Sequence, residues 1–122
     1  MSTLTVTNIK ATGETASRSA TGVAAAWVNF NGTGTPAARD SLNHSSITDH
    51  GTGNYTNTVS SAFDNANYVV TAMSQDTSVG DVIAFDNGTA PTTTAVKIYN
   101  FTTGSSIADC ARICLSIHGD LA

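Results

Sequence analysis

The sequence predicts an all-β fold, a small antiparallel β-sandwich of about seven or eight strands with an extended N-terminal arm. Small polar residues and alanine fill much of the chain, and only 11% of its 122 residues are charged, whereas about 25% is usual in soluble domains. Threonine favours pleated surfaces, while asparagine and glycine favour turns. Several short segments alternate apolar and polar side chains and stop at such turn residues, as strands with one buried face do. A chain of this length has room for a single core.

Residues 1–22 are expected to form an arm, and residues 23–122 the sandwich domain. Leu4, Val6 and Ile9 give the arm a short strand-like run, but the residues after them lack large apolar side chains. A segment of this composition cannot bury a core of its own. We therefore expect a neighbouring chain to hold the arm in place, with those three residues as its anchor.

The first strand of the domain is expected at residues 25–31, before a turn that Gly32 and Gly34 favour. Successive side chains of a strand point to opposite faces. The alternation separates three apolar residues from the chain's only tryptophan and two asparagines, with Ala26, Val28 and Phe30 set against Trp27, Asn29 and Asn31. We expect the first set to be buried and Trp27 to lie on the opposite face.

A hairpin with a loop of about five residues is expected within residues 45–56, because Asp49, Gly51 and Gly53 lie between two runs rich in threonine and serine. Residues 36–43, which precede it, are expected to be a connection or a single helical turn. Further strands are expected at residues 68–73, 79–85, 95–101 and 111–118.

The last of these strands has an apolar face and a mixed face. The mixed face is a candidate for subunit contact and equally a candidate for a solvent-facing side, with Cys110, Arg112, Cys114 and His118 as the contact residues. Residues four apart in a strand lie roughly 13 Å apart, whereas a disulfide allows a Cα separation of about 7 Å at most. We therefore expect no intrachain disulfide, and either free buried thiols or contact with cysteines of sister subunits.

Charge argues against a nucleic-acid partner. The formal net charge is −4, and the five cationic residues are scattered along the chain, as Lys10, Arg18, Arg39, Lys97 and Arg112, whereas binding to phosphate backbones needs clustered Lys and Arg. No apolar run reaches the 18 or so residues that span a bilayer, and the first residues lack the basic flank and apolar region of a signal peptide. We expect no membrane insertion and synthesis in a host cytoplasm.

Catalytic and metal-binding patterns are not found. His44 and His50 lie in turn-rich sequence, and their spacing to each other and to His118 fits no recognised ligand set. Motifs for a nucleophilic serine or a phosphate-binding loop are missing. We expect no metal, no cofactor and no enzymatic activity.

Five motifs follow one another between about residues 20 and 120, namely AWVNFNGTG, RDSLN, SSITDHGTGNYT, ANYVV and a final IHGD. In this order they resemble a domain common at the C-terminal ends of tailed-bacteriophage fibres and in short phage structural proteins. His50 stands where that family more often has an uncharged or amide residue. The resemblance implies an all-β virion protein, a homotrimer that lies near the outside of the particle.

Three functions from different classes follow. The first is a fibre-tip or spike module that binds a glycan on the host surface, because aromatic rings stack on sugars while amide and carboxylate groups hydrogen-bond their hydroxyls. Its candidate ligand residues are Trp27, Asn29, Asn31, Asp49, His50, Tyr55 and Tyr99. The alternative is a capsid decoration protein, a cement or head-fibre protein whose N-terminal arm binds other virion proteins. The third, a glycan-degrading enzyme, is disfavoured.

Overall fold

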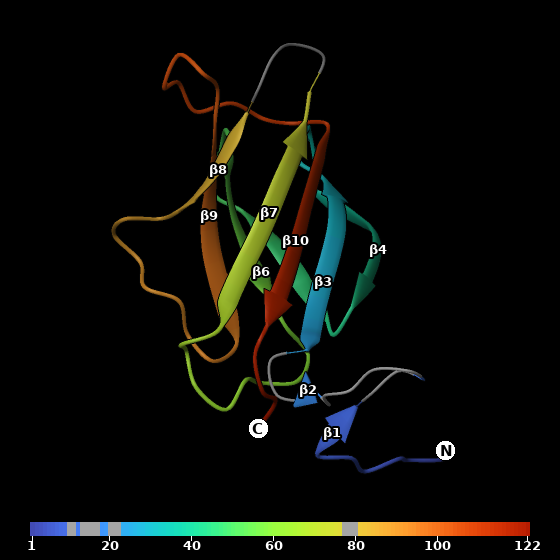
Figure 1. Ribbon diagram of the computed structural model, residues 1–122. Coiled ribbons are helices and arrows are strands. Elements are labelled where there is room, and N and C mark those ends of the chain that lie inside the picture. Colours follow the sequence, from blue (N-terminus) through green and yellow to red (C-terminus); the bar gives the residue numbers. More distant parts are fainter. Residues whose placement is uncertain (10–11, 13–17, 20–22, 77–80) are drawn as a thin grey trace.

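The computed structural model describes residues 1–9, 12, 18–19, 23–76 and 81–122, and within them it is all-β, as the sequence predicts (Figure 1). Two four-stranded antiparallel sheets form a sandwich, and a third, two-stranded sheet lies beside its lower end. The strand order of the first sheet is β4(Ala37–Leu42), β3(Ala24–Asn31), β10(Arg112–His118) and β7(Val69–Gln75). That of the second is β5(Ser46–Asp49), β6(Asn54–Thr58), β9(Ala95–Phe101) and β8(Val82–Phe85). The small sheet pairs β1(Asn8–Ile9) with β2(Arg18–Ser19).

The core lies between the two large sheets, and the alternation of the strands decides which side chains enter it. On β3, Val28 and Phe30 are almost completely buried, and their neighbours on β10 are buried in the same way. The second sheet contributes Tyr55 of β6 and Ile98 of β9, which face each other across the ladder. The rings of Phe30 and Tyr55 join the two sheets edge to face, with centroids 5.4 Å apart. The predicted buried faces of β3 and β10 are therefore confirmed.

Residues 36–43 differ from the expectation. They contain β4, which pairs antiparallel with β3, and they form neither a plain connection nor a helical turn. Gly34 has a φ of 64°, which allows a tight return of the chain after β3. A register shift between Asn29 and Phe30 disturbs the alternation on the pairing strands, and most of β4 is exposed. An exposed strand lacks the apolar pattern by which sequence reasoning finds strands.

The predicted hairpin within residues 45–56 is confirmed as β5 and β6, which pair from Ser46 with Thr58 to Asp49 with Tyr55. The strand expected at residues 79–85 is found as β8, which begins at Val82, and residues 77–80 lie outside the described part.

The described part of the predicted arm is exposed throughout residues 1–9. Residues 10–11, 13–17 and 20–22 of that arm lie outside the described residues. Leu4 is 84% exposed and Val6 43%. The anchoring of the arm on a neighbouring chain stays a prediction.

Candidate functional site

The predicted ligand residues do not form one site. Trp27 and Asn29 lie on the outer face of the first sheet, with Asn31 at the end of the same strand. Asp49 and His50 lie at the tip of the β5–β6 hairpin, and Tyr99 is on the outer face of the second sheet. The seventh residue, Tyr55, is in the core.

The prediction that Tyr55 contacts a ligand is wrong, because its side chain is 1% exposed and holds internal segments together. Its hydroxyl lies 2.6 Å from the carbonyl oxygen of Gly32 and 2.9 Å from Oδ1 of Asp109. Burial, and then the hydrogen bond and negative charge of Asp109, raise the pKa of Tyr55 well above its usual value. The phenol therefore stays protonated and donates to these two acceptors.

Gly32 and Gly53 pack closely around the hydroxyl of Tyr55 and the segment of Ile107 to Cys110. A Cβ on Gly32 would lie 2.7 Å from the hydroxyl of Tyr55, and a Cβ on Gly53 would lie 2.5 Å from Cγ2 of Ile107. The N–H of Gly53 donates to Oδ1 of Asp109 at 2.8 Å, and the N–H of Gly32 donates to the carbonyl of Cys110 at 2.9 Å. Gly32, Gly53, Tyr55 and Asp109, with the backbone of Cys110, are called the latch below. The latch explains by packing one glycine of each Gly-Thr-Gly motif, Gly32 and Gly53.

The hairpin tip is exposed, and its polar side chains bond locally. Oδ1 of Asp49 accepts a hydrogen bond from the N–H of Gly51 at 2.8 Å, and Nε2 of His50 lies 2.9 Å from Oγ1 of Thr56. These contacts shape the loop and leave the remaining polar atoms of both side chains facing outward.

Tyr99 belongs to an aromatic and charged cluster on the second sheet. Its ring lies 5.7 Å from that of Phe101, and Nζ of Lys97 lies 5.9 Å from its centroid. Lys97 also pairs with Asp86 at 3.1 Å. Burial opposes ionisation of Asp86, but Lys97, the N–H of Gly88 and Tyr99 outweigh it and lower the pKa of Asp86 to about 2. Tyr99, Phe101 and Lys97 are called the aromatic cluster below.

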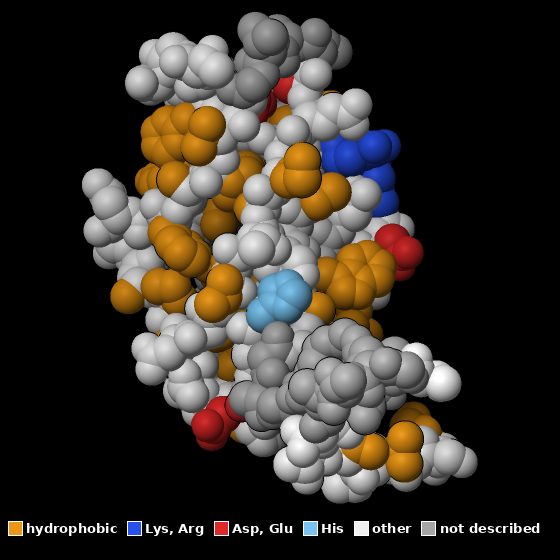
Figure 2. All heavy atoms as spheres, viewed as in Figure 1, with side chains coloured by type: hydrophobic (Ala, Val, Ile, Leu, Met, Phe, Trp, Pro, Cys, Tyr) orange, Lys and Arg blue, Asp and Glu red, His pale blue; other side chains and the backbone are white. Residues whose placement is uncertain are grey.

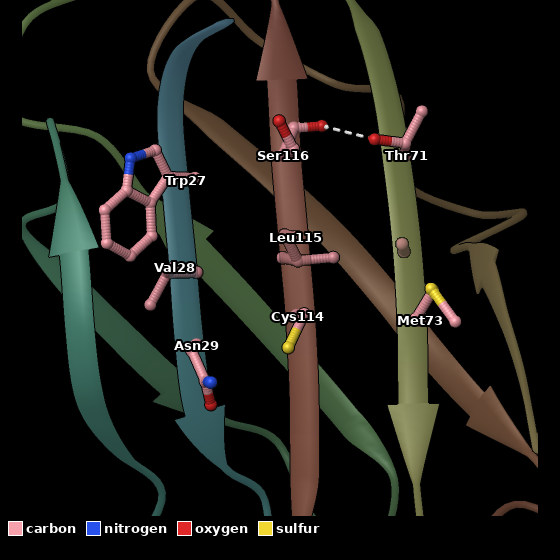
Figure 3. Close-up of a pocket in the computed structure, with 9 residues that line it drawn as sticks. Trp27, Val28, Asn29, Thr71, Met73, Cys114, Leu115 and Ser116 are labelled. Atoms are coloured by element: carbon pink, nitrogen blue, oxygen red, sulfur yellow. Dashed lines mark hydrogen bonds between the residues drawn. The ribbon is translucent and has the colours of Figure 1, made fainter.

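A shallow hollow of about 480 Å³ crosses the outer face of the first sheet (Figure 3). Outward side chains of β3, β10 and β7 line it, mainly Trp27, Asn29, Cys114, Ser116, Thr71 and Met73. Met73 is 77% exposed, and Oδ1 of Asn29 is buried without a hydrogen-bond partner. Within the described part of the chain, no charged side chain lines this hollow. Figure 2 shows hydrophobic side chains spread over the same face.

The predicted contact residues of the last strand separate into two groups. Arg112, Cys114 and His118 lie on the outer face, as expected. Cys110 is fully buried in the core, so its place on the contact face is wrong. It precedes the strand, which begins at Arg112, so the alternation does not reach it. Its thiol donates to the carbonyl of Gln75 at 3.0 Å, and burial raises its pKa. Both cysteines are free, as predicted.

A second hollow, of about 180 Å³, was missed by sequence reasoning. It lies between β7 and β8, where the two sheets stand side by side without pairing, and it is lined by Val70, Ala72, Ile83, Ala84, Phe85 and Ile98. We call it the side opening. Phe85 pairs with Ile98 and so faces the core side of its sheet, yet it is 50% exposed. A usable signal was present, because β7 and β8 contain no charged residue, whereas edge strands usually carry one.

A three-residue metal site and a membrane-spanning helix are both absent from the described part of the chain. No group of three His, Cys, Asp or Glu side chains there is placed to hold a metal ion. Nδ1 of the partly buried His44 instead lies 2.7 Å from Oδ1 of Asn57. In that same part of the chain, no helix has the length and apolar character to cross a bilayer.

The chain matches no family model, no curated protein and no solved structure.

Proposed function

We propose that the chain is a non-enzymatic structural protein of a bacteriophage virion, a homotrimeric tail-fibre or spike tip module that binds a glycan on the host cell surface. The observation that carries the proposal is the uncharged hollow on the outer face of the first sheet. An antiparallel sheet that faces water on one side normally alternates to polar residues there. Here Trp27, Met73 and Cys114 lie on that face among polar residues such as Asn29, Thr71 and Ser116. The motif resemblance to phage fibre domains supports the same function.

In this proposal, sister subunits cover the outer face of the first sheet. Subunit interfaces are depleted in charge at their centre and enriched in aromatic residues and methionine. Trp27, Asn29 and Met73 have this character, so Trp27 and Asn29 are assigned to subunit contact and no longer to a ligand. An interface also gives the unpartnered Oδ1 of Asn29 the chance to meet a donor on another subunit.

The glycan surface then lies on the opposite sheet. With the first sheet turned towards sister subunits, the aromatic cluster on the second sheet faces outward. The rings of Tyr99 and Phe101 offer a stacking platform for a sugar, and Lys97 beside them suits a sugar that carries a carboxylate. The polar candidates on this side are Asp49, the last residue of β5 in this sheet, and His50, which follows it; both are exposed.

Oligomeric state is the first test. Sedimentation velocity and native mass spectrometry are expected to report a trimer of the full chain, and Met73→Asp is expected to shift it towards monomer, because it places a charge in the contact face. Thr48→Asp, on an exposed position of β5 in the other sheet, is the matched control and is expected to leave the trimer intact. A monomeric wild-type chain contradicts the proposal.

Glycan recognition is the second test. The trimer is applied to an array of bacterial surface polysaccharides. Binding to members of the array is expected to fall about tenfold or more with Tyr99→Ala, because the variant removes a ring of the stacking platform; for comparison, stacking of a nucleic-acid base on an aromatic side chain contributes on the order of 1–3 kcal/mol. Thr48→Ala is the control. An array without any bound member contradicts host attachment.

Capsid decoration is the alternative, and the exposed apolar residues of the arm favour it. Leu4 and Val6 are the kind of side chains that would fix a small protein to another virion protein. Immunogold labelling of intact particles separates the two roles. Label at the tail end supports attachment, whereas regular label over the head supports decoration.

A further inference from the structure

We propose that residues 2–7 of one copy of this chain add as a strand to the free edge of β7 in a second copy and insert Leu4 and Val6 into its side opening. The proposal deepens the trimeric assembly above and rests on it. It assigns the arm an acceptor, which the assembly alone does not specify.

The acceptor is an unsatisfied sheet edge. β7 pairs with β10 on one side, and among the described residues no strand pairs with its other side; the same holds for the outer side of β8. Unpaired edges offer N–H and C=O groups to another strand, and natural sheets protect such edges with charge or proline. Neither β7 nor β8 contains a charged residue or a proline. This edge is therefore open to strand addition.

The side opening beside that edge is lined by apolar side chains and reaches the buried Ile98 of the core. Its volume of about 180 Å³ is several times the roughly 30 Å³ that one water molecule occupies in the liquid. Phe85 points to the core side of its sheet but stays half exposed, while Ile98 beside it is 1% exposed. A covering strand with apolar side chains on one face would remove Phe85 and Ile83 from water.

The arm has the matching pattern. From Thr3 to Thr7 it alternates threonine with Leu4 and Val6, so a strand here would place both aliphatic side chains on one face and the threonines on the other. β-branched residues favour this conformation. Six residues in a strand span about 20 Å, close to the roughly 23 Å of the seven-residue β7. In the structure these residues form no strand, and Leu4 is 84% exposed.

The position of the arm favours a second copy as the acceptor. In Figure 1 the segment before β1 runs away from the lower end of the sandwich, on the side of β3, while β8 lies on the other side. β1 is tied to β2, and only residues 20–23 separate β2 from β3. That linker spans about 18 Å at most. Each copy can thus donate one strand and accept one; such a head-to-tail contact forms a ring when the rotation between copies closes, and a ring of three is the closed form that matches the proposed trimer.

Covalent trapping tests the contact directly. Two full-length chains with different tags are co-expressed in a Cys114→Ser background; one carries Leu4→Cys or Val6→Cys and the other carries Phe85→Cys. Oxidation is expected to give a disulfide-linked pair with both tags for at least one of the two arm positions. Thr5→Cys is the matched control, because it lies on the opposite strand face and is expected to give no such pair. Failure of both arm positions overturns the proposal.

A charge test adds a solution measurement. The double variant Leu4→Asp with Val6→Asp is expected to raise the dissociation constant of the oligomer about 100-fold or more, since two aliphatic side chains lose their burial. Thr3→Asp with Thr5→Asp adds the same charge to the other face and is expected to change it only a few-fold. Equal effects of the two variants overturn strand donation. A wild-type trimer that the first variant leaves intact overturns strand donation alone, whereas a wild-type monomer overturns the trimeric assembly as well.

Discussion

The latch and the side opening both lie where the two sheets of the sandwich come together. They differ in whether their polar groups and apolar side chains have partners within one chain. In the latch, the hydroxyl of Tyr55 and the N–H groups of Gly32 and Gly53 each have a partner within 3 Å. At the side opening, Phe85 is half exposed and the edges of β7 and β8 are unpaired among the described residues. The first region is complete within one chain, whereas in the proposed assembly a strand from another copy completes the second.

This difference indicates that one set of residues determines the stability of the subunit and another set determines its association. A substitution in the latch changes a contact that exists in the isolated subunit, so it acts on the free energy of unfolding. A substitution beside the side opening changes a surface that is exposed in that subunit, so it acts on association. Four predictions test this separation, and all unfolding measurements are made at one subunit concentration because oligomerisation shifts apparent stability.

The largest effect is expected for Gly53→Ala. Its φ is +62°, and the new Cβ would lie 2.6 Å from the carbonyl oxygen of Ala108. Strain and overpacking together are expected to cost about 4 kcal/mol, measured by urea unfolding. Gly34→Ala is the matched control, because its φ is +64° but no atom lies within 4 Å of the added Cβ, and it is expected to cost about 1–2 kcal/mol. Equal costs would show that space in the latch does not matter.

Tyr55→Phe is expected to have the second largest effect. It removes the hydroxyl that lies near Gly32 and Asp109 and leaves a buried carbonyl without its donor, which costs about 1–3 kcal/mol. Tyr99→Phe, on the outer face of the other sheet, is the control; it removes a partly exposed hydroxyl that hydrogen-bonds Asp86 and is expected to cost less, no more than about 1 kcal/mol. If the two variants unfold alike, the latch hydrogen bond contributes nothing to stability.

Asp86→Asn is expected to destabilise the chain at neutral pH, with a difference from wild type that disappears in acid. The folded-state pKa of Asp86 is about 2, below the ordinary value of 3.8, so its contribution to stability is complete above pH 4 and is lost as the pH falls towards 2. The free energy of unfolding of the wild-type chain therefore falls between pH 4 and pH 2. That of the variant, which lacks this carboxylate, falls less over the same range. Urea midpoints measured from pH 5 to pH 2 report the difference. Asp64→Asn, an exposed position, is the control and is expected to keep the wild-type acid dependence.

The smallest effect on the isolated subunit is expected for Val82→Lys on β8, the strand that borders the side opening. Val82 is 57% exposed, so the lysine stays in water and the free energy of unfolding of a monomeric background, such as the Met73→Asp chain, changes by less than about 0.5 kcal/mol. In the Met73 wild-type background the same lysine is expected to weaken the oligomer, as seen by sedimentation velocity. A large loss of subunit stability would mean that Val82 belongs to the internal core.

Sequence reasoning succeeded where a strand has one buried face and failed where it has none. The alternation of Val28 and Phe30 against Trp27 and Asn29 placed β3 correctly, and the same pattern placed the buried face of β10. The exposed β4 carries no such pattern and was taken for a connection or a helical turn. Sequence reasoning assigns Tyr55 to a ligand as an aromatic ring that can stack on a sugar; only its position opposite Ile98 makes it a core residue.

The sequence by itself determined the all-β class, the buried faces, the free cysteines and the hairpin, because each follows from side-chain alternation or turn chemistry over a few neighbouring residues. Only the tertiary structure decided that Gly32, Gly53 and Asp109 meet at Tyr55, and that β7 and β8 leave an opening between them. Both outcomes depend on which strands lie side by side. Such pairings join residues far apart in the chain, and local patterns carry no information on them.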